Sequence, residues 1–126
     1  MPVVNAFHGT PYRFAEFVCP PSGLHFGTID QAAHAATIKL GKMPVDELAI
    51  LPIDHHGWRG LVIPVRLTIH RLKRVRDART AKAWAKQIAV ARAEGFDGLV
   101  YRNHYEGRDG ADSYCVFDAR QVERMA

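Results

Sequence analysis

Cysteine and long apolar runs are both scarce in this sequence. Its 126 residues include two cysteines, Cys19 and Cys115, which lie far apart and lack the spacing of a metal-binding knuckle. This argues against a disulfide framework and predicts two small, apolar side chains in a reducing cytoplasm. No apolar run approaches about 18 residues, and no basic region followed by an apolar stretch opens the sequence. We therefore expect a soluble protein with no membrane contact and no export signal.

Patterns typical of several cofactor and catalytic sites are also missing. The sequence contains no glycine-rich phosphate loop of the dinucleotide or P-loop type, and no serine-hydrolase arrangement. His55 and His56 are adjacent, but no acidic residue or cysteine stands at ligand spacing from them. We therefore predict no metal site.

The composition fits one compact domain covering residues 1–126. Apolar residues make up 48% of the chain, charged residues 24% and aromatic residues 10%, which is ordinary for a globular core. The formal net charge of +4 is unevenly distributed, because residues 66–92 hold nine basic residues and one acidic residue. This segment predicts a basic face that contacts a polyanion, or simply the solvated side of a helix.

Local patterns predict a mixture of strands and helices. Short β-rich runs predict strands over residues 3–7, 24–27, 61–75, 98–102 and 113–117. Helical spacing predicts helices over residues 29–40 and 80–94. The first begins at a Thr28–Gln31 capping box. We expect a loop over residues 42–60, with one helical turn near 46–48, and a second loop over 103–112. Residues 12–18 form an amphipathic stretch whose pattern does not decide between helix and strand.

Three separated pieces of sequence carry most of the functional information. The first is His8-Gly9-Thr10 at the end of a strand, and the second is His25-Phe26-Gly27-Thr28 before an alanine-rich helix. The third is the strand that leads from Gly98 into Asn103-x-x-Glu106, followed by a closing aromatic strand. Together they resemble the ADP-ribosyltransferase superfamily, in its small phage and polyvalent-protein branch. The resemblance implies an α+β fold, namely an ADP-ribosyltransferase-like split mixed β-sandwich with flanking helices and a cleft for NAD.

The resemblance also assigns roles to individual residues. It places His8 and Gly9, with Thr10 beside them, on a ribose and the nicotinamide amide of NAD. The position where the family usually has tyrosine reads His25-Phe26 here, so His25, Phe26 or Tyr101 would supply the ring against nicotinamide. The remaining residues that it assigns to NAD binding are Gly27, Thr28 and Asn103.

The catalytic acid implied by the resemblance is Glu106, acting with His8. A carboxylate near the ribose stabilises the oxocarbenium-like state in which the nicotinamide–ribose bond breaks. Asp112, next to the last predicted strand, is the alternative carboxylate. A glutamate in a polar loop can also be merely solvated, and the sequence alone leaves this choice open.

The resulting hypothesis is an NAD-dependent ADP-ribosyltransferase. It would transfer ADP-ribose to an unidentified protein or nucleic acid, as a phage or mobile-element product in the cytoplasm of a bacterial host. Residues 66–79 would then contact the pyrophosphate of NAD or an acidic target. Three alternatives stay open. One is an antibiotic-modifying transferase, because rifampin-type transferases also begin with a histidine-glycine-threonine motif. The other two are a catalytically inactive binding or inhibitor module for a nucleic acid or protein, and an RNA 2′-phosphotransferase-like relative.

Overall fold

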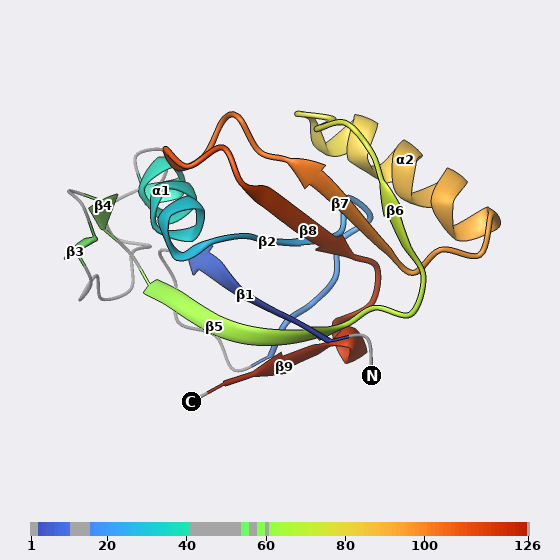
Figure 1. Cartoon of the computed structure of the whole chain (residues 1–126), viewed down its shortest axis with the longest axis horizontal. Coiled ribbons are helices and arrows are strands. Elements are labelled where there is room, and N and C mark those ends of the chain that lie inside the picture. The colour runs from blue at the N-terminus through green and yellow to red at the C-terminus, as the bar shows by residue number, and fades with distance from the viewer. Residues whose placement is uncertain (1–2, 11–15, 41–53, 56–57, 60, 126) are drawn as a thin grey trace.

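The chain adopts a mixed α+β fold in which two helices pack against two β-sheets (Figure 1). The computed structural model describes residues 3–10, 16–40, 54–55, 58–59 and 61–125. The helices in this part of the chain are α1 (Ile29–Leu40) and α2 (Ala81–Ala93), with a short 3-10 turn at Ala119–Gln121. The strands are β1 (Val3–Thr10), β2 (Leu24–Phe26), β3 (Asp54–His55), β4 (Trp58–Arg59), β5 (Leu61–Thr68), β6 (Leu72–Arg74), β7 (Gly98–Arg102), β8 (Asp112–Val116) and β9 (Val122–Arg124).

The two sheets meet at their edges. One is antiparallel with strand order β1-β5-β9, and the other is mixed with order β2-β8-β7-β6, in which β6 runs parallel to β7. Edge strands β1 and β2 touch through a single bridge, where Phe7 and Gly27 exchange backbone hydrogen bonds of 2.8 and 2.9 Å. The segments that carry the first two sequence motifs are thereby held side by side. A separate two-residue ladder joins β3 to β4.

Two apolar clusters stabilise this arrangement. One gathers Leu24 and Phe26 of β2 with residues of β1, β5 and β8, and it fills the space between the sheets. The other packs Trp84 and Ile88 of α2 against the opposite face of the mixed sheet. Cys115 is fully buried in this second cluster, as the sequence predicts, and burial raises the pKa of its thiol. Alternate residues of β8 serve the two clusters, Tyr114 and Val116 the first and Cys115 the second, because successive side chains of a strand point to opposite faces.

Both predicted helices are confirmed, and side-chain hydrogen bonds explain where α1 begins. Thr28 Oγ1 accepts the amide of Gln31, whose side-chain oxygen in turn accepts the amide of Thr28, each at 3.1 Å. This is the predicted capping box. Helix α1 lies tightly on β1 at Gly9, where a Cβ atom would stand 1.7 Å from the carbonyl oxygen of Ala32. A glycine is therefore required at this position for the helix to approach the strand.

The prediction of one continuous strand over residues 61–75 is wrong. The chain turns at His70 and Arg71, so β5 belongs to one sheet and β6 to the other. The carboxylate of Asp97 accepts the backbone amides of both turn residues, at 3.0 and 2.7 Å. Strand β9 and the 3-10 turn before it have no counterpart among the predicted elements, the last of which ends at residue 117. The helical turn expected at residues 46–48 and most of the 12–18 stretch lie outside the described residues, whereas β3 and β4 occupy part of the predicted 42–60 loop.

Candidate functional site

A cavity of about 540 Å³ lies where β1 meets β2. Its wall is formed by both strands, by α1, by the first turn of α2, by β7 and by the loop that follows β7. Seven of the residues assigned from the sequence line it: His8, Gly9, His25, Phe26, Gly27, Tyr101 and Glu106. The three sequence motifs thus converge on one cavity, with His8 and Glu106 both in its wall.

Three other assigned residues do not line the cavity. Thr10 is buried at the end of β1, and Thr28 is occupied with the cap of α1 and with Asp109, whose carboxylate accepts its hydroxyl at 2.7 Å. Asn103 is 2% exposed and acts behind the wall. These residues support the site and are not part of its surface.

The position of Glu106 is fixed by Asn103. The side-chain amide of Asn103 donates to Glu106 Oε1 at 3.0 Å, and its oxygen accepts the backbone amide of Glu106 at 3.0 Å. The same amide group also donates to Ser113 Oγ at 3.0 Å. Asn103 is therefore a positioning residue for the carboxylate.

Gln31 extends this network to helix α1, and the sequence analysis did not single it out for this role. Gln31 is 1% exposed, and its Oε1 accepts the hydroxyl of Ser113 at 2.7 Å. Its Nε2 donates to the carbonyl of Ala111 at 2.9 Å and to Asp109 at 3.2 Å. A chain of hydrogen bonds thus runs from Gln31 through Ser113 and Asn103 to Glu106.

The loop after Glu106 is fastened to the same helix. Gly107 has a φ of +75°, and a Cβ there would stand 2.9 to 3.1 Å from atoms of Gln31. Its backbone amide donates to His34 Nδ1 at 2.8 Å, and the amide of Arg108 donates to Asp30. Glycine is suited to this position both for its left-handed backbone and for the close approach.

His8 stands in a poorly solvated part of the cavity wall. Its ring packs against Phe17 and Phe26, with centroid distances of 5.2 and 5.4 Å. Burial, assisted by the positive charge of Lys39, lowers the pKa of His8 to about 4. Because a carbonyl oxygen only accepts hydrogen bonds, the 3.0 Å contact with the His25 carbonyl places a hydrogen on His8 Nδ1. At neutral pH the ring is therefore uncharged.

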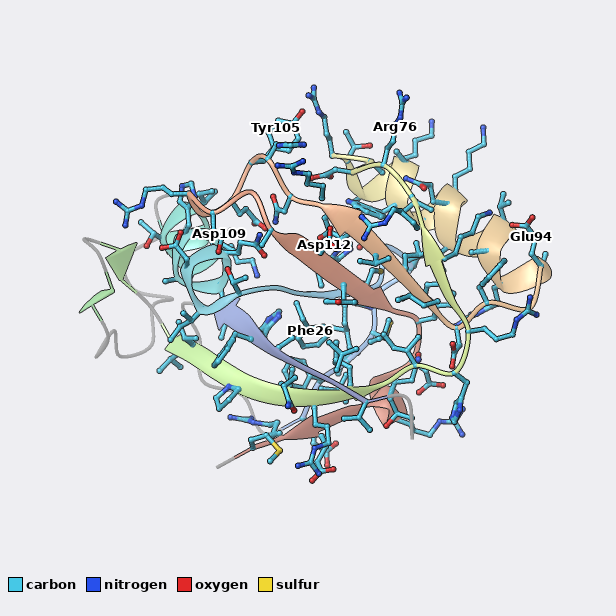
Figure 2. The ribbon with its side chains drawn as sticks, in the orientation of Figure 1. Phe26, Arg76, Glu94, Tyr105, Asp109 and Asp112 are labelled. Carbon is cyan, nitrogen blue, oxygen red and sulfur yellow. The ribbon has the colours of Figure 1, made fainter. Side chains whose placement is uncertain are left out.

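His25, Trp84 and Tyr101 form an aromatic part of the wall. The ring of His25 lies 4.7 Å from Trp84 and 5.7 Å from Tyr101. Its Nε2 donates to the Ser22 carbonyl at 2.8 Å, so its Nδ1 accepts the hydroxyl of Tyr101 at 2.9 Å. Phe26 is 2% exposed and lies between the sheets (Figure 2), so its ring presents almost no surface to a ligand.

The cation in the cavity wall is Lys39, which the sequence analysis did not single out. Its ammonium group donates to the carbonyl of Gly9 at 3.0 Å. Desolvation lowers the pKa of Lys39, and the negative charge of Glu106 acts in the opposite direction. None of the basic residues in 66–79 lines this cavity, so the expected contact between that segment and a pyrophosphate here is not supported.

Asp112, the alternative carboxylate, is held elsewhere. It forms a two-bond ion pair with Arg74, at 3.0 and 2.7 Å, and it does not line the cavity. The hydrogen bond with Arg74 lowers the pKa of Asp112. Of the two candidate carboxylates, Glu106 is therefore the one that lines the cavity together with His8 and Lys39.

No protein-family model matches this chain, and neither the curated proteins nor the solved structures that were compared with it gave a match. In the described part of the chain, no three His, Cys, Asp or Glu residues come together in a way that could hold a metal ion. No helix among the described residues is long and apolar enough to span a membrane.

The low pKa of His8 leads to a prediction about stability. An unfolded histidine titrates near 6.5, so between about pH 6.5 and 4 the unfolded chain takes up a proton that folded His8 does not. Stability is thus retained above pH 6.5 and lost as the pH falls towards 4. We expect His8→Asn, which keeps a side-chain N–H donor, to reduce the loss of unfolding free energy between pH 7.5 and 4.5 by roughly 2 kcal/mol. Urea unfolding at the two pH values measures this loss for both proteins. Equal losses of unfolding free energy would contradict the low pKa assigned to His8.

Proposed function

We propose that this protein is an NAD-dependent ADP-ribosyltransferase with a macromolecular acceptor. One observation carries the proposal: His8 and Glu106, from motifs near opposite ends of the sequence, line the same cavity. The arrangement of the sheets supports it as well. An antiparallel sheet and a mixed sheet that are joined at one edge by the Phe7–Gly27 bridge and pack together through the first apolar cluster fit the split mixed β-sandwich that the resemblance implies.

The groups in the cavity suit the parts of NAD. The volume of the cavity, about 540 Å³, lies within the range of about 300–1,000 Å³ common for small-molecule sites. The half-buried ring of His25, which packs on the buried rings of Tyr101 and Trp84, offers ring surface for nicotinamide, and the Lys39 ammonium offers a positive charge for the pyrophosphate. Glu106 and His8 offer hydrogen-bonding groups for the ribose hydroxyls.

The proposed chemistry depends mainly on Glu106. NAD, when bound, supplies an ADP-ribosyl group joined to nicotinamide as the leaving group. Glu106 would accept a hydrogen bond from a ribose hydroxyl, and its negative charge would stabilise the positive charge that develops as that bond weakens. Asn103 would hold the carboxylate in place, so little reorganisation accompanies the reaction. Neutral His8 would orient the ligand from its own part of the wall without adding a positive charge.

Incubation with a bacterial lysate and NAD labelled in its adenosine half tests this function. The account predicts that the label becomes attached to a macromolecule, and that Glu106→Gln removes this labelling. Digestion of the product with nuclease or protease identifies the acceptor class. An inactive binding module would capture a partner and release no nicotinamide. If the purified protein neither binds NAD nor releases nicotinamide with any lysate fraction, the transferase proposal is lost.

A further inference from the structure

A second cavity, of about 580 Å³, lies between the segment after β6 and the start of the loop after β7. We call this cavity the arginine groove, and its polar wall is formed by Arg74, Arg76, Asp77, Arg79, Arg102, His104 and Tyr105. Arg76 and Tyr105 project from the same edge of the molecule (Figure 2). The segment 66–92 does not form the single basic face that its composition suggests. Arg66 lies in the three-stranded sheet near Glu123, and Lys73 pairs with Glu94, whereas Arg76 and Arg79 line the groove.

The arginine groove carries excess positive charge. Within the described residues, Arg76, Arg79 and Arg102 form no ion pair, whereas Arg74, which lines the same cavity, is neutralised by Asp112. Asp77 is the acidic residue that lines the same cavity, and its carboxylate accepts the backbone amide of Arg79 at 2.9 Å. Unpaired guanidinium groups around one cavity are suited to hold phosphate groups.

An exposed aromatic ring lies among these cations. Tyr105 keeps 46% of its surface exposed, and the guanidinium carbon of Arg79 lies 4.3 Å from its ring centroid. Arg79 has a φ of +70°, a backbone conformation uncommon for residues other than glycine. A ring beside several arginines is the combination with which proteins bind single-stranded nucleic acid, because bases stack on the ring and phosphates meet the cations.

The arginine groove and the first cavity share one turn of the chain. Asn103 Oδ1 accepts the backbone amides of both Tyr105 and Glu106, each at 3.0 Å. Tyr105 then lines the groove, whereas Glu106 lines the cavity with His8. A polymer held in the groove would therefore pass next to the residue that precedes the proposed catalytic carboxylate.

We propose that the arginine groove binds single-stranded nucleic acid, with phosphates on its arginines and a base against Tyr105. The further role of that strand as the acceptor of ADP-ribose rests on the proposed function, but the binding does not. An acidic protein segment would satisfy the arginines and leave the exposed ring unused, so nucleic acid accounts for more of the surface.

Fluorescence anisotropy with labelled 12-nucleotide DNA and RNA single strands tests the binding. We expect the double variant R76Q/R79Q to weaken binding at least tenfold. Losing two phosphate contacts should also reduce the slope of log affinity against log salt by about 1.4. The matched control R66Q/R124Q removes the same charge from the three-stranded sheet and should change affinity less than threefold. Equal weakening by both double variants would show that net charge alone attracts the strand and would overturn the proposal.

The ring is tested separately in the same assay. Tyr105→Ala should weaken binding about tenfold with little change in the salt slope, whereas Tyr105→Phe should retain it. The relative affinities for DNA and RNA then indicate which strand is preferred. Tighter binding of an acidic polypeptide than of either strand, with no effect of Tyr105→Ala, would replace nucleic acid with a protein partner.

The two proposals can fail independently. Strand binding is measured without NAD, and Glu106→Gln should bind strands as the unmodified chain does. Groove-dependent binding without any nicotinamide release would leave the arginine groove in place and remove the transferase. Nicotinamide release, together with strand binding that the groove substitutions leave unchanged, would retain the transferase and overturn the arginine groove.

Discussion

Replacing Glu106 with glutamine is expected to slow nicotinamide release from NAD by about a thousandfold while the fold stays intact. The substitution removes the negative charge that would stabilise the transition state, and groups of this kind contribute about a hundred- to a thousandfold. It preserves the oxygen that accepts the hydrogen bond from Asn103. Chromatographic measurement of nicotinamide gives the rate, and circular dichroism with thermal unfolding verifies the fold.

Asp112→Asn is the matched control for this result. It also removes one carboxylate charge, but from the ion pair with Arg74 outside the cavity. We expect nicotinamide release to change less than fivefold and stability to fall by no more than about 1 kcal/mol, as is usual for an exposed ion pair. If Asp112→Asn were inactive and Glu106→Gln were active, the catalytic carboxylate would have to be reassigned.

Replacing Gln31 with leucine should destabilise the protein by roughly 3–5 kcal/mol, because it leaves several buried polar groups without a partner. The Ser113 hydroxyl, the Thr28 amide and the Ala111 carbonyl all bond to the Gln31 side chain. Urea unfolding measures this loss. Nicotinamide release should also fall at least tenfold at temperatures where the variant is still folded, because the hydrogen bonds that lead to Glu106 are broken.

Gln121→Leu separates the two effects of the Gln31 substitution. Gln121 also makes four side-chain hydrogen bonds, but they go to Thr68, Asp97, Phe117 and Asp118, none of which lines the cavity. This variant should lose stability and keep its rate of nicotinamide release per folded molecule. An equal loss of rate in both variants would mean that the Gln31 network has no special connection to Glu106.

Local signals explain why some elements could be predicted. Thr28 and Gln31 lie three residues apart, so their reciprocal cap can be recognised in the sequence and is present in the structure. The division between β5 and β6 could not be recognised in this way. It depends on Asp97, whose carboxylate binds the backbone of residues 70 and 71 from more than twenty positions away.

The candidate site shows the same division between local and distant causes. His8, His25 and Glu106 stand in motifs with recognisable spacing, and they line one cavity. Lys39 looks like an ordinary lysine in the last turn of a helix, and only the packing of α1 on β1 brings its ammonium group to Gly9. The arginines of residues 66–92 form one cluster in the sequence, but the change of sheet after β5 distributes them over different surfaces.

An NMR titration of isotopically labelled protein with NAD tests the central claim most directly. The account predicts that signals of His8, Gly9, Gly27, Lys39 and Tyr101 shift together with the side chain of Glu106, since all six residues line one cavity. Glu106→Gln should weaken these shifts without moving them to other residues. Shifts confined to the arginine groove, or no shifts at millimolar NAD, would contradict the claim that this cavity binds the dinucleotide.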